Sequence, residues 1–161
     1  MRGKLIAGFG GIGKTTLGKK YDNVLDLESS NFKYIIDEEL KELNVEERKG
    51  LKTRTPNKDF PINYYNAIIE NLEKYDIVLI SMHNEIVEML RENKIDYTVV
   101  YPKEDMLDEI MQRFINRGNT EDFLSGVKDA YYRLYPDKND KVIWLDSGEY
   151  LEDILKEFKL I

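Results

Sequence analysis

The sequence contains no cysteine, so it forms no disulfide and offers no thiolate to a metal ion or to a substrate. No apolar run approaches the ~20 residues that span a bilayer. The first residues lack the apolar region and the cleavage site of a signal peptide. We therefore expect a cytoplasmic protein without a membrane partner.

A basic excess is also missing, because the formal net charge is −7. Nucleic-acid binding relies on clustered positive charge, so we expect no nucleic-acid partner. An acidic protein can still bind a small anion through a few well-placed cations. The composition therefore favours a small-molecule nucleotide substrate over a polymer. The oligomeric state is left open.

Short apolar runs alternate along the chain with segments of helical periodicity. Five apolar strands alternating with helices predict an α/β fold, with a five-stranded, mostly parallel sheet between two layers of helices. We treat residues 1–161 as a single domain. The expected strands are 4–9, 23–27, 76–81, 97–101 and 142–145, and the expected helices are 14–21, 32–49, 62–75, 83–93, 104–117, 119 to about 134, and 149–158.

A phosphate-binding loop is the most specific motif. Gly8, Gly13, Lys14 and Thr15 match G-x-x-x-x-G-K-[ST] between an expected strand and an expected helix. Glycines let the loop turn tightly and point its N–H groups at phosphate oxygens. We expect ATP and Mg²⁺, with Lys14 on the β- and γ-phosphates and the Thr15 hydroxyl on the metal. The nucleotide contacts are assigned to Gly8, Gly10, Gly11, Ile12, Gly13, Lys14, Thr15 and Thr16, the last of which is otherwise only a helix residue.

With this loop the chain resembles the P-loop kinases of the nucleoside monophosphate kinase (adenylate and thymidylate kinase) and shikimate kinase group. The resemblance implies a three-layer P-loop NTPase fold and phosphoryl transfer from ATP. It also implies a helical lid at about residues 104–134 and an acceptor-binding region at about residues 31–65.

Two acidic residues after the second expected strand extend this resemblance. Asp26 and Glu28 match the D-x-D of shikimate kinases, with Glu in the second place. There the first acid helps to hold Mg²⁺ through water, and the second contacts the acceptor. The alternative is a pair of solvated acids beside a helix cap at Ser29 or Ser30.

An acid is missing after the third expected strand, where many P-loop NTPases orient the metal shell. The strand ends in Ser81-Met82-His83 instead. Asp26 must then complete the metal site, or the protein does not turn over. Ser81 and His83 occupy the mouth of the site, where the imidazole binds a phosphate or a hydroxyl, or else makes a structural bond.

Arginines are few, and two of them fit the lid. Arg113 and Arg117 match the R-x-x-x-R of adenylate kinases, in which the first stacks on adenine and the second contacts the transferred phosphate. The i, i+4 spacing puts both on one helix face, although Glu109 could pair with Arg113 on the surface instead. Gly148 lies in the turn after the last strand, beside the adenine in this group, where a helix cap at Ser147 is the alternative.

The acceptor side is less specific. Arg54 is the best candidate to bind an acceptor phosphate, and Phe60 or Tyr64 could stack on a base or serve as core anchors. If Arg54 binds an acceptor phosphate, we expect Arg54, Arg113 and Arg117 around one cleft, and Arg54 on the opposite face would contradict this idea.

The leading interpretation is an ATP-dependent kinase of a nucleoside monophosphate. The alternatives are a kinase of a small hydroxyl-bearing metabolite or of a 5′-hydroxyl end, and a non-catalytic ATP-binding protein. A hydroxyl acceptor would lose its proton to Asp26 or Glu28. The composition, rich in Lys, Ile, Asn and Glu, is typical of an AT-rich bacterial or phage gene.

Overall fold

A parallel β-sheet forms the centre of the protein in the computed structural model, which describes residues 2–49, 51 and 54–161. Within these residues the sheet has five strands in the order β2-β3-β1-β4-β5, and every neighbouring pair is parallel. The predicted fold class and sheet are confirmed. The strands are β1 (Lys4–Gly8), β2 (Val24–Leu27), β3 (Ile77–Ser81), β4 (Thr98–Pro102) and β5 (Val142–Leu145).

The two central strands owe their position to continuous apolar sequence. β1 and β3 are buried over four of their five residues each, without the alternation of a strand that has one wet face. Their register pairs Gly8 with Ser81, so both strands end at the same edge of the sheet. The segments that follow them are therefore brought together at this edge.

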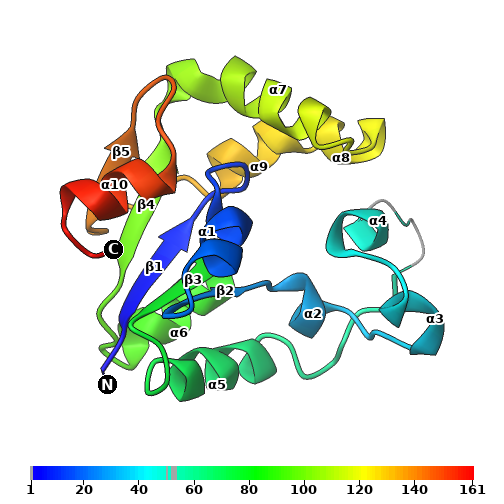
Figure 1. Ribbon diagram of the computed structural model, residues 1–161. Helices are drawn as coiled ribbons and strands as arrows, with labels where there is room; N and C mark the ends of the chain where they lie inside the picture. Colours follow the sequence, from blue (N-terminus) through cyan, green and yellow to red (C-terminus); the bar gives the residue numbers. More distant parts are fainter. Residues whose placement is uncertain (1, 50, 52–53) are drawn as a thin grey trace.

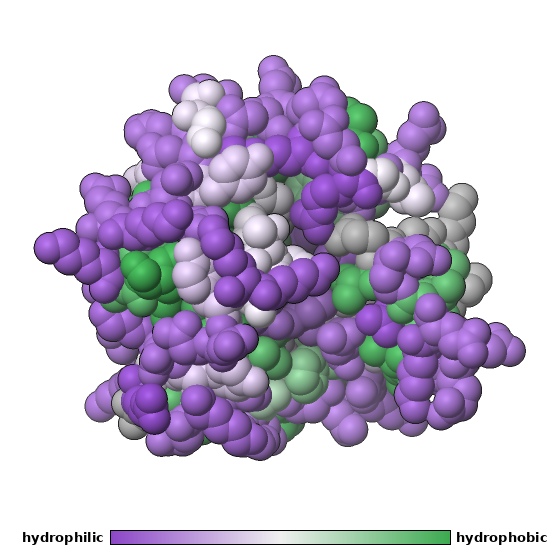
Figure 2. Space-filling model, in the orientation of Figure 1, coloured by the Kyte–Doolittle hydropathy of each residue, from purple (hydrophilic) through white to green (hydrophobic). Residues whose placement is uncertain are grey.

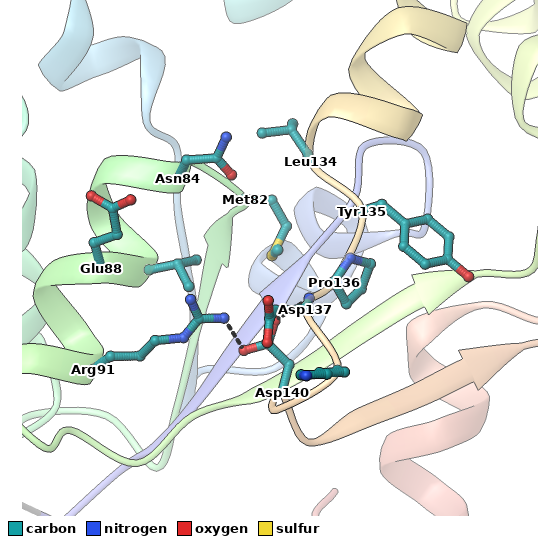
Figure 3. A pocket seen from close by; sticks show the side chains of 11 residues that line it. Met82, Asn84, Glu88, Arg91, Leu134, Tyr135, Pro136, Asp137 and Asp140 are labelled. Atoms are coloured by element: carbon teal, nitrogen blue, oxygen red, sulfur yellow. Dashed lines mark hydrogen bonds and ion pairs between the residues drawn. The ribbon is translucent and has the colours of Figure 1, made fainter.

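Helices cover both faces of the sheet. Helices α1 and α10 lie on one face, and α6 and α9 lie on the other (Figures 1 and 3). No helix in the described part of the chain is long and apolar enough to cross a bilayer. The longer helices are α1 (Lys14–Lys20), α5 (Ile62–Asn71), α6 (Asn84–Glu92), α7 (Leu107–Asn116), α9 (Val127–Arg133) and α10 (Leu151–Glu157).

The predicted continuous helix over residues 32–49 is wrong. Three short helices replace it: α2 (Ser30–Lys33), α3 (Glu38–Lys41) and α4 (Val45–Lys49). Asp37 accepts a hydrogen bond from the Leu40 amide at 3.1 Å, and Asn44 accepts one from the Glu47 amide at 2.8 Å. Side-chain caps of this kind start a new helix, so each interrupts the run.

The predicted lid is also more divided than expected. A 3-10 turn, η1 (Glu104–Met106), precedes α7, and the helix expected from 119 to about 134 is split into α8 (Glu121–Ser125) and α9. The split falls at Gly126, a poor helix former. Gly118, with φ of +81°, ends α7 as expected, and Thr120 caps α8.

Candidate active site

The glycine-rich loop connects β1 to α1 at the carboxyl edge of the sheet. Gly11 and Gly13 have φ of +77° and +99°, which residues with a Cβ rarely adopt. A Cβ at Gly10 would lie 2.8 Å from the Phe114 ring of α7. The loop therefore needs glycine both for its own turn and for the close approach of α7.

Lys14 lies over this loop. Its Nζ donates hydrogen bonds to the carbonyl oxygens of Gly8 and Phe9, at 2.8 and 2.9 Å. Burial lowers the pKa of Lys14 to about 8, although Asp26 and Glu28 favour its charged form. At neutral pH the side chain thus still carries most of a positive charge, at the mouth of the loop.

Thr15 and Asp26 form the next contact. The Thr15 hydroxyl donates to Oδ2 of Asp26 at 2.9 Å, and Gly18 of α1 lets the strand approach, because a Cβ there would lie 3.0 Å from the Asp26 Cβ. Burial raises the pKa of Asp26, and the Lys14 charge and the Thr15 hydrogen bond offset this only in part.

This hydroxyl and carboxylate are hard oxygen donors that suit Mg²⁺. Among the described residues no three His, Cys, Asp or Glu side chains group into a metal cage. The Thr15 hydroxyl and the Asp26 carboxylate would fill two positions of such an ion, and phosphate and water oxygens would fill the others.

Glu28 follows β2 and has the opposite electrostatic balance. Burial acts to raise its pKa, but Lys49, whose Nζ lies 3.6 Å from Oε2, and Lys14 outweigh that effect, so the pKa is lowered. The backbone N–H of Ser30 also donates to Oε1, at 3.3 Å. Glu28 is therefore a stable carboxylate beside the more easily protonated Asp26.

Arg113 joins α7 to the loop and to the turn before α10. Its guanidinium donates to the Gly11 carbonyl at 3.0 Å and to the Glu149 carbonyl at 2.9 Å. It also pairs with Glu109 at 2.6 Å and stacks on the Tyr150 ring, 3.8 Å from the centroid. Arg113 thus makes the alternative pairing with Glu109 and also contacts the loop, while its stacking on adenine stays a prediction.

These groups line a cleft of about 1050 Å³. One wall consists of the loop, α1 and the C-terminal part of α7, and the other includes residues of α2 and α4. The face of the molecule around it is mainly hydrophilic (Figure 2). The lining residues are Gly11, Gly13, Lys14, Thr15, Thr16, Gly18, Lys19, Leu25, Asp26, Glu28, Asn31, Asn44, Val45, Arg48, Arg113, Asn116, Arg117 and Tyr150.

Solved kinases share this architecture over nearly their whole length. A sugar kinase from a Janibacter species aligns with a TM-score of 0.59 at 15% identity, covering 99% of this chain and 93% of that one. A gluconokinase from Sinorhizobium meliloti aligns at 0.56 and 17% identity, covering 97% and 89%. A shikimate kinase from Acinetobacter baumannii, in complex with shikimate, aligns at 0.54 and 17% identity, covering 99% and 92%.

The protein has the P-loop kinase fold. At these identities the likeness concerns the fold alone. No protein-family model matches the sequence, and no curated protein matches it significantly.

Within the P-loop kinase fold, half of the residues singled out from the sequence come together in the cleft. They are Gly11, Gly13, Lys14, Thr15, Thr16, Asp26, Glu28, Arg113 and Arg117. The remaining loop residues, Gly8, Gly10 and Ile12, do not line it. The Ile12 side chain is fully buried, and its carbonyl accepts from the Leu151 amide at 2.9 Å. Gly148 donates its N–H to Glu109 at 3.0 Å and also lies outside the lining.

The residues predicted to bind the acceptor, apart from Glu28, do not line the cleft. Arg54 lies outside the cleft lining, and its guanidinium stacks on the Tyr34 ring at 3.9 Å. The single cleft with Arg54, Arg113 and Arg117 is thus not observed. Tyr64 has no exposed surface, and its hydroxyl donates to the Leu27 carbonyl at 2.6 Å. Of its two predicted roles, the structure shows the core anchor.

Phe60 and His83 belong to the same internal cluster. The Phe60 ring packs on Tyr64 and lies 5.5 Å from the His83 ring. His83 Nε2 lies 2.8 Å from the Ser29 hydroxyl, and burial lowers the His83 pKa to about 4, so the imidazole is neutral at pH 7. Ser81 donates its N–H to the Tyr64 hydroxyl at 3.3 Å. These structural bonds involve the His83 imidazole and the Ser81 backbone amide, and neither residue lines the cleft.

Sequence reasoning missed the wall formed by Asn31, Asn44, Val45 and Arg48. A continuous helix over residues 32–49 gave no reason to single out Arg48. The usable signal was Asn44-x-x-Glu47: the Glu47 carboxylate also lies 3.4 Å from the Asn44 amide, so the pair is a reciprocal cap. Such a cap predicts a helix that starts at Val45.

A second cavity of about 490 Å³ lies between α6 and the segment that leads from α9 to β5 (Figure 3). Arg91 and Asp140 pair across it at 2.7 Å, and Tyr97 donates to the same carboxylate at 2.6 Å. No residue singled out from the sequence lines it. Arg91 and Asp140 satisfy each other's charge, which is typical of a structural contact.

Proposed function

We propose that the protein is an ATP-dependent kinase that phosphorylates a hydroxyl group of a small polar metabolite. The observation that carries this proposal is the arrangement in one cleft of the P-loop, the paired acids Asp26 and Glu28, and the arginines Arg113 and Arg117 at the end of α7. The solved structures with this fold are named as kinases of gluconate, a sugar and shikimate, which supports a hydroxyl acceptor.

The donor nucleotide occupies the P-loop side of the cleft. ATP would supply the γ-phosphoryl group, and Thr15 and Asp26 would hold Mg²⁺, whose charge would neutralise the phosphate oxygens. Lys14 and Arg117 add positive charge in the same cleft, where charge develops on the group in transfer. Arg113 and Tyr150 form the wall beside the loop, a flat surface suited to a base.

Transfer requires one proton acceptor. The acceptor oxygen bonds to the γ-phosphorus while the bond from phosphorus to the β,γ-bridging oxygen breaks, and its electron pair leaves with ADP. The hydroxyl proton passes to Asp26. Asp26 suits this task better than Glu28, because its pKa is raised whereas that of Glu28 is lowered.

A nucleoside monophosphate is the second candidate acceptor. Arg48 and Arg117 in the cleft favour it, because both could bind an acceptor phosphate. The lining on the α4 side argues against it, since the only aromatic side chain among the described lining residues is Tyr150, which stacks on Arg113. A base bound near α4 would thus find no ring to stack on.

An acceptor panel tests the proposal. ADP release from ATP and Mg²⁺ would be measured with sugar acids, neutral sugars, shikimate, nucleoside monophosphates and a 5′-hydroxyl oligonucleotide. We expect a hydroxyl metabolite to raise ADP release at least tenfold over hydrolysis. Lys14→Ala should abolish ATP binding, and the exposed Lys128→Ala should not. Intact, Lys14-dependent ATP binding without stimulation by any acceptor would identify a non-catalytic ATP-binding protein instead.

A further inference from the structure

Arg48 is a cation of the cleft, and the described residues provide it with no acidic partner. It lies on α4, in the wall that faces the P-loop, and is half-buried. Its Nη2 donates to the Asn31 side-chain oxygen at 3.3 Å, a long hydrogen bond to a neutral group. Among the described residues, no carboxylate lies within ion-pair distance of it.

The two acids of the cleft are already engaged elsewhere. Asp26 accepts from Thr15 at 2.9 Å. Glu28 pairs with Lys49 and accepts from the Ser30 amide. The charge of Arg48 is therefore left to the solvent of the cleft, which attracts a negative group of a ligand.

The neighbours of Arg48 limit the kind of ligand. Asn31, Asn44 and Val45 line the same wall, and this wall contributes no aromatic ring to the lining. Side-chain amides can donate to and accept from hydroxyl groups. Arginine binds planar or tetrahedral oxyanions with two parallel hydrogen bonds. Together they suit a small ligand that carries both hydroxyls and an anionic group.

We propose that Arg48 binds a carboxylate or phosphate group of the acceptor, and that it thereby selects acceptors that combine a hydroxyl with a negative charge. This proposal rests on the proposed function, because it assigns the acceptor side of the same cleft. Arg48 is a specificity-determining residue that binds a part of the acceptor remote from the reacting hydroxyl.

Arg54 provides the matched control. It is an arginine of the same acceptor-side region, only six positions further along the chain, but its guanidinium stacks on Tyr34 outside the cleft lining. Replacing either residue by Ala removes one positive charge from this side of the molecule. A general electrostatic effect would affect both variants equally, whereas a direct contact affects Arg48 alone.

The experiment uses acceptors in pairs that differ by the anionic group. Gluconate is compared with glucose for the carboxylate arm, and a nucleoside monophosphate with its nucleoside for the phosphate arm. We expect the anionic member of one pair to be preferred, which identifies the source of the charge. Arg48→Ala should raise the KM for the anionic acceptor roughly tenfold to a hundredfold, with little change in kcat. This pattern is expected for the loss of a charge-assisted contact that is equally strong in the ground state and in the transition state.

The variants separate this contact from a folding effect. Arg48→Lys keeps the charge without the paired geometry and should give an intermediate KM, and Arg54→Ala should resemble the wild type. Thermal unfolding checks that each variant is folded. Equal effects of Arg48→Ala on charged and neutral acceptors, or a preference for the neutral member of both pairs, would overturn the proposal while leaving the kinase activity in place.

A binding measurement covers the case of no turnover. Calorimetry with the same compounds, in the presence of a non-hydrolysable ATP analogue, would detect anion binding directly. Arg48-dependent binding of a charged compound without ADP release would support the role of Arg48 and contradict only the proposed function. Absence of any Arg48-dependent anion binding would overturn the role of Arg48.

Discussion

The Asp26 carboxylate is suited to the proposed chemistry, but its burial costs the protein stability. Its carboxylate accepts the Thr15 hydrogen bond at the position proposed for the metal, but burial raises its pKa. A group whose folded pKa is raised above its unfolded value costs stability at every pH at which it is ionised in the folded protein. Glu28, two residues later, has a lowered pKa and contributes stability as an anion. At neutral pH the charge of Asp26 therefore destabilises the folded protein, whereas the charge of Glu28 stabilises it.

Substitution with the isosteric amides tests this difference. Asp26→Asn should reduce kcat at least 100-fold, because the proposed proton acceptor is lost, yet it should raise the melting temperature at pH 7. Glu28→Gln, its matched control, should lower the melting temperature at the same pH. Steady-state kinetics and thermal unfolding measure both. A less stable Asp26→Asn protein with unchanged turnover would remove Asp26 from both roles.

At the scale of elements, α7 is held on the nucleotide loop by a small set of polar contacts. Glu109 accepts from the Ser147 hydroxyl at 2.8 Å and from the Gly148 amide at 3.0 Å, and these bonds lower its pKa. It also pairs with Arg113, which reaches the Gly11 carbonyl. One side chain thus connects the helix, the turn before α10 and, through Arg113, the loop.

Glu109→Ala should remove the hydrogen bonds that connect α7 to Arg113 and to the turn before α10. We expect the affinity for ATP to fall about tenfold, the value of one charge-assisted hydrogen bond, because Arg113 and the turn are no longer pre-organised. Hydrogen exchange of α7 should become faster. Asp108→Ala, an exposed neighbour on the same helix, serves as the control and should change neither property. Equal effects of the two substitutions would show that only net charge matters.

For the molecule as a whole, the sheet could be predicted because its strands are short apolar runs that alternate with helical segments. The loop side of the cleft could also be predicted, since the motif around Lys14 specifies its geometry, while its contacts with ATP stay a prediction. The acceptor side could not. Its wall depends on where the capped helices of residues 30–49 pack, and side-chain caps at Asp37 and Asn44 decide this against a weak helical periodicity.

Tyr64 shows why chemical type alone misassigns a residue. An aromatic in the acceptor segment can stack on a base or fill the core, and only burial distinguishes the two. Its hydroxyl contacts the Leu27 carbonyl and the Ser81 amide, so it joins the ends of β2 and β3. Burial raises its pKa, which keeps the hydroxyl protonated as a donor.

Tyr64→Phe should therefore lower the free energy of unfolding by about 1–2 kcal/mol, the cost of leaving a buried carbonyl without its donor. The KM values for ATP and acceptor should stay within twofold. Tyr65→Phe, on a less buried neighbouring ring, should have no such effect on stability. Chemical denaturation and kinetics provide the measurements. A raised KM for the acceptor with unchanged stability would indicate that Tyr64 contacts the acceptor and is not a core anchor.

The strand order places the P-loop strand β1 in the middle of the sheet, and the two walls of the cleft come from separate stretches of the chain. The wall assigned to the acceptor derives from residues 28–48, and the opposite wall beyond the loop derives from residues 113–150. Evolution could thus adapt this fold to a new metabolite by exchanging one contiguous segment that leaves the loop, Thr15 and Asp26 in place. Nucleotide use would be inherited unchanged, so acceptor and donor specificity are free to diverge at different rates.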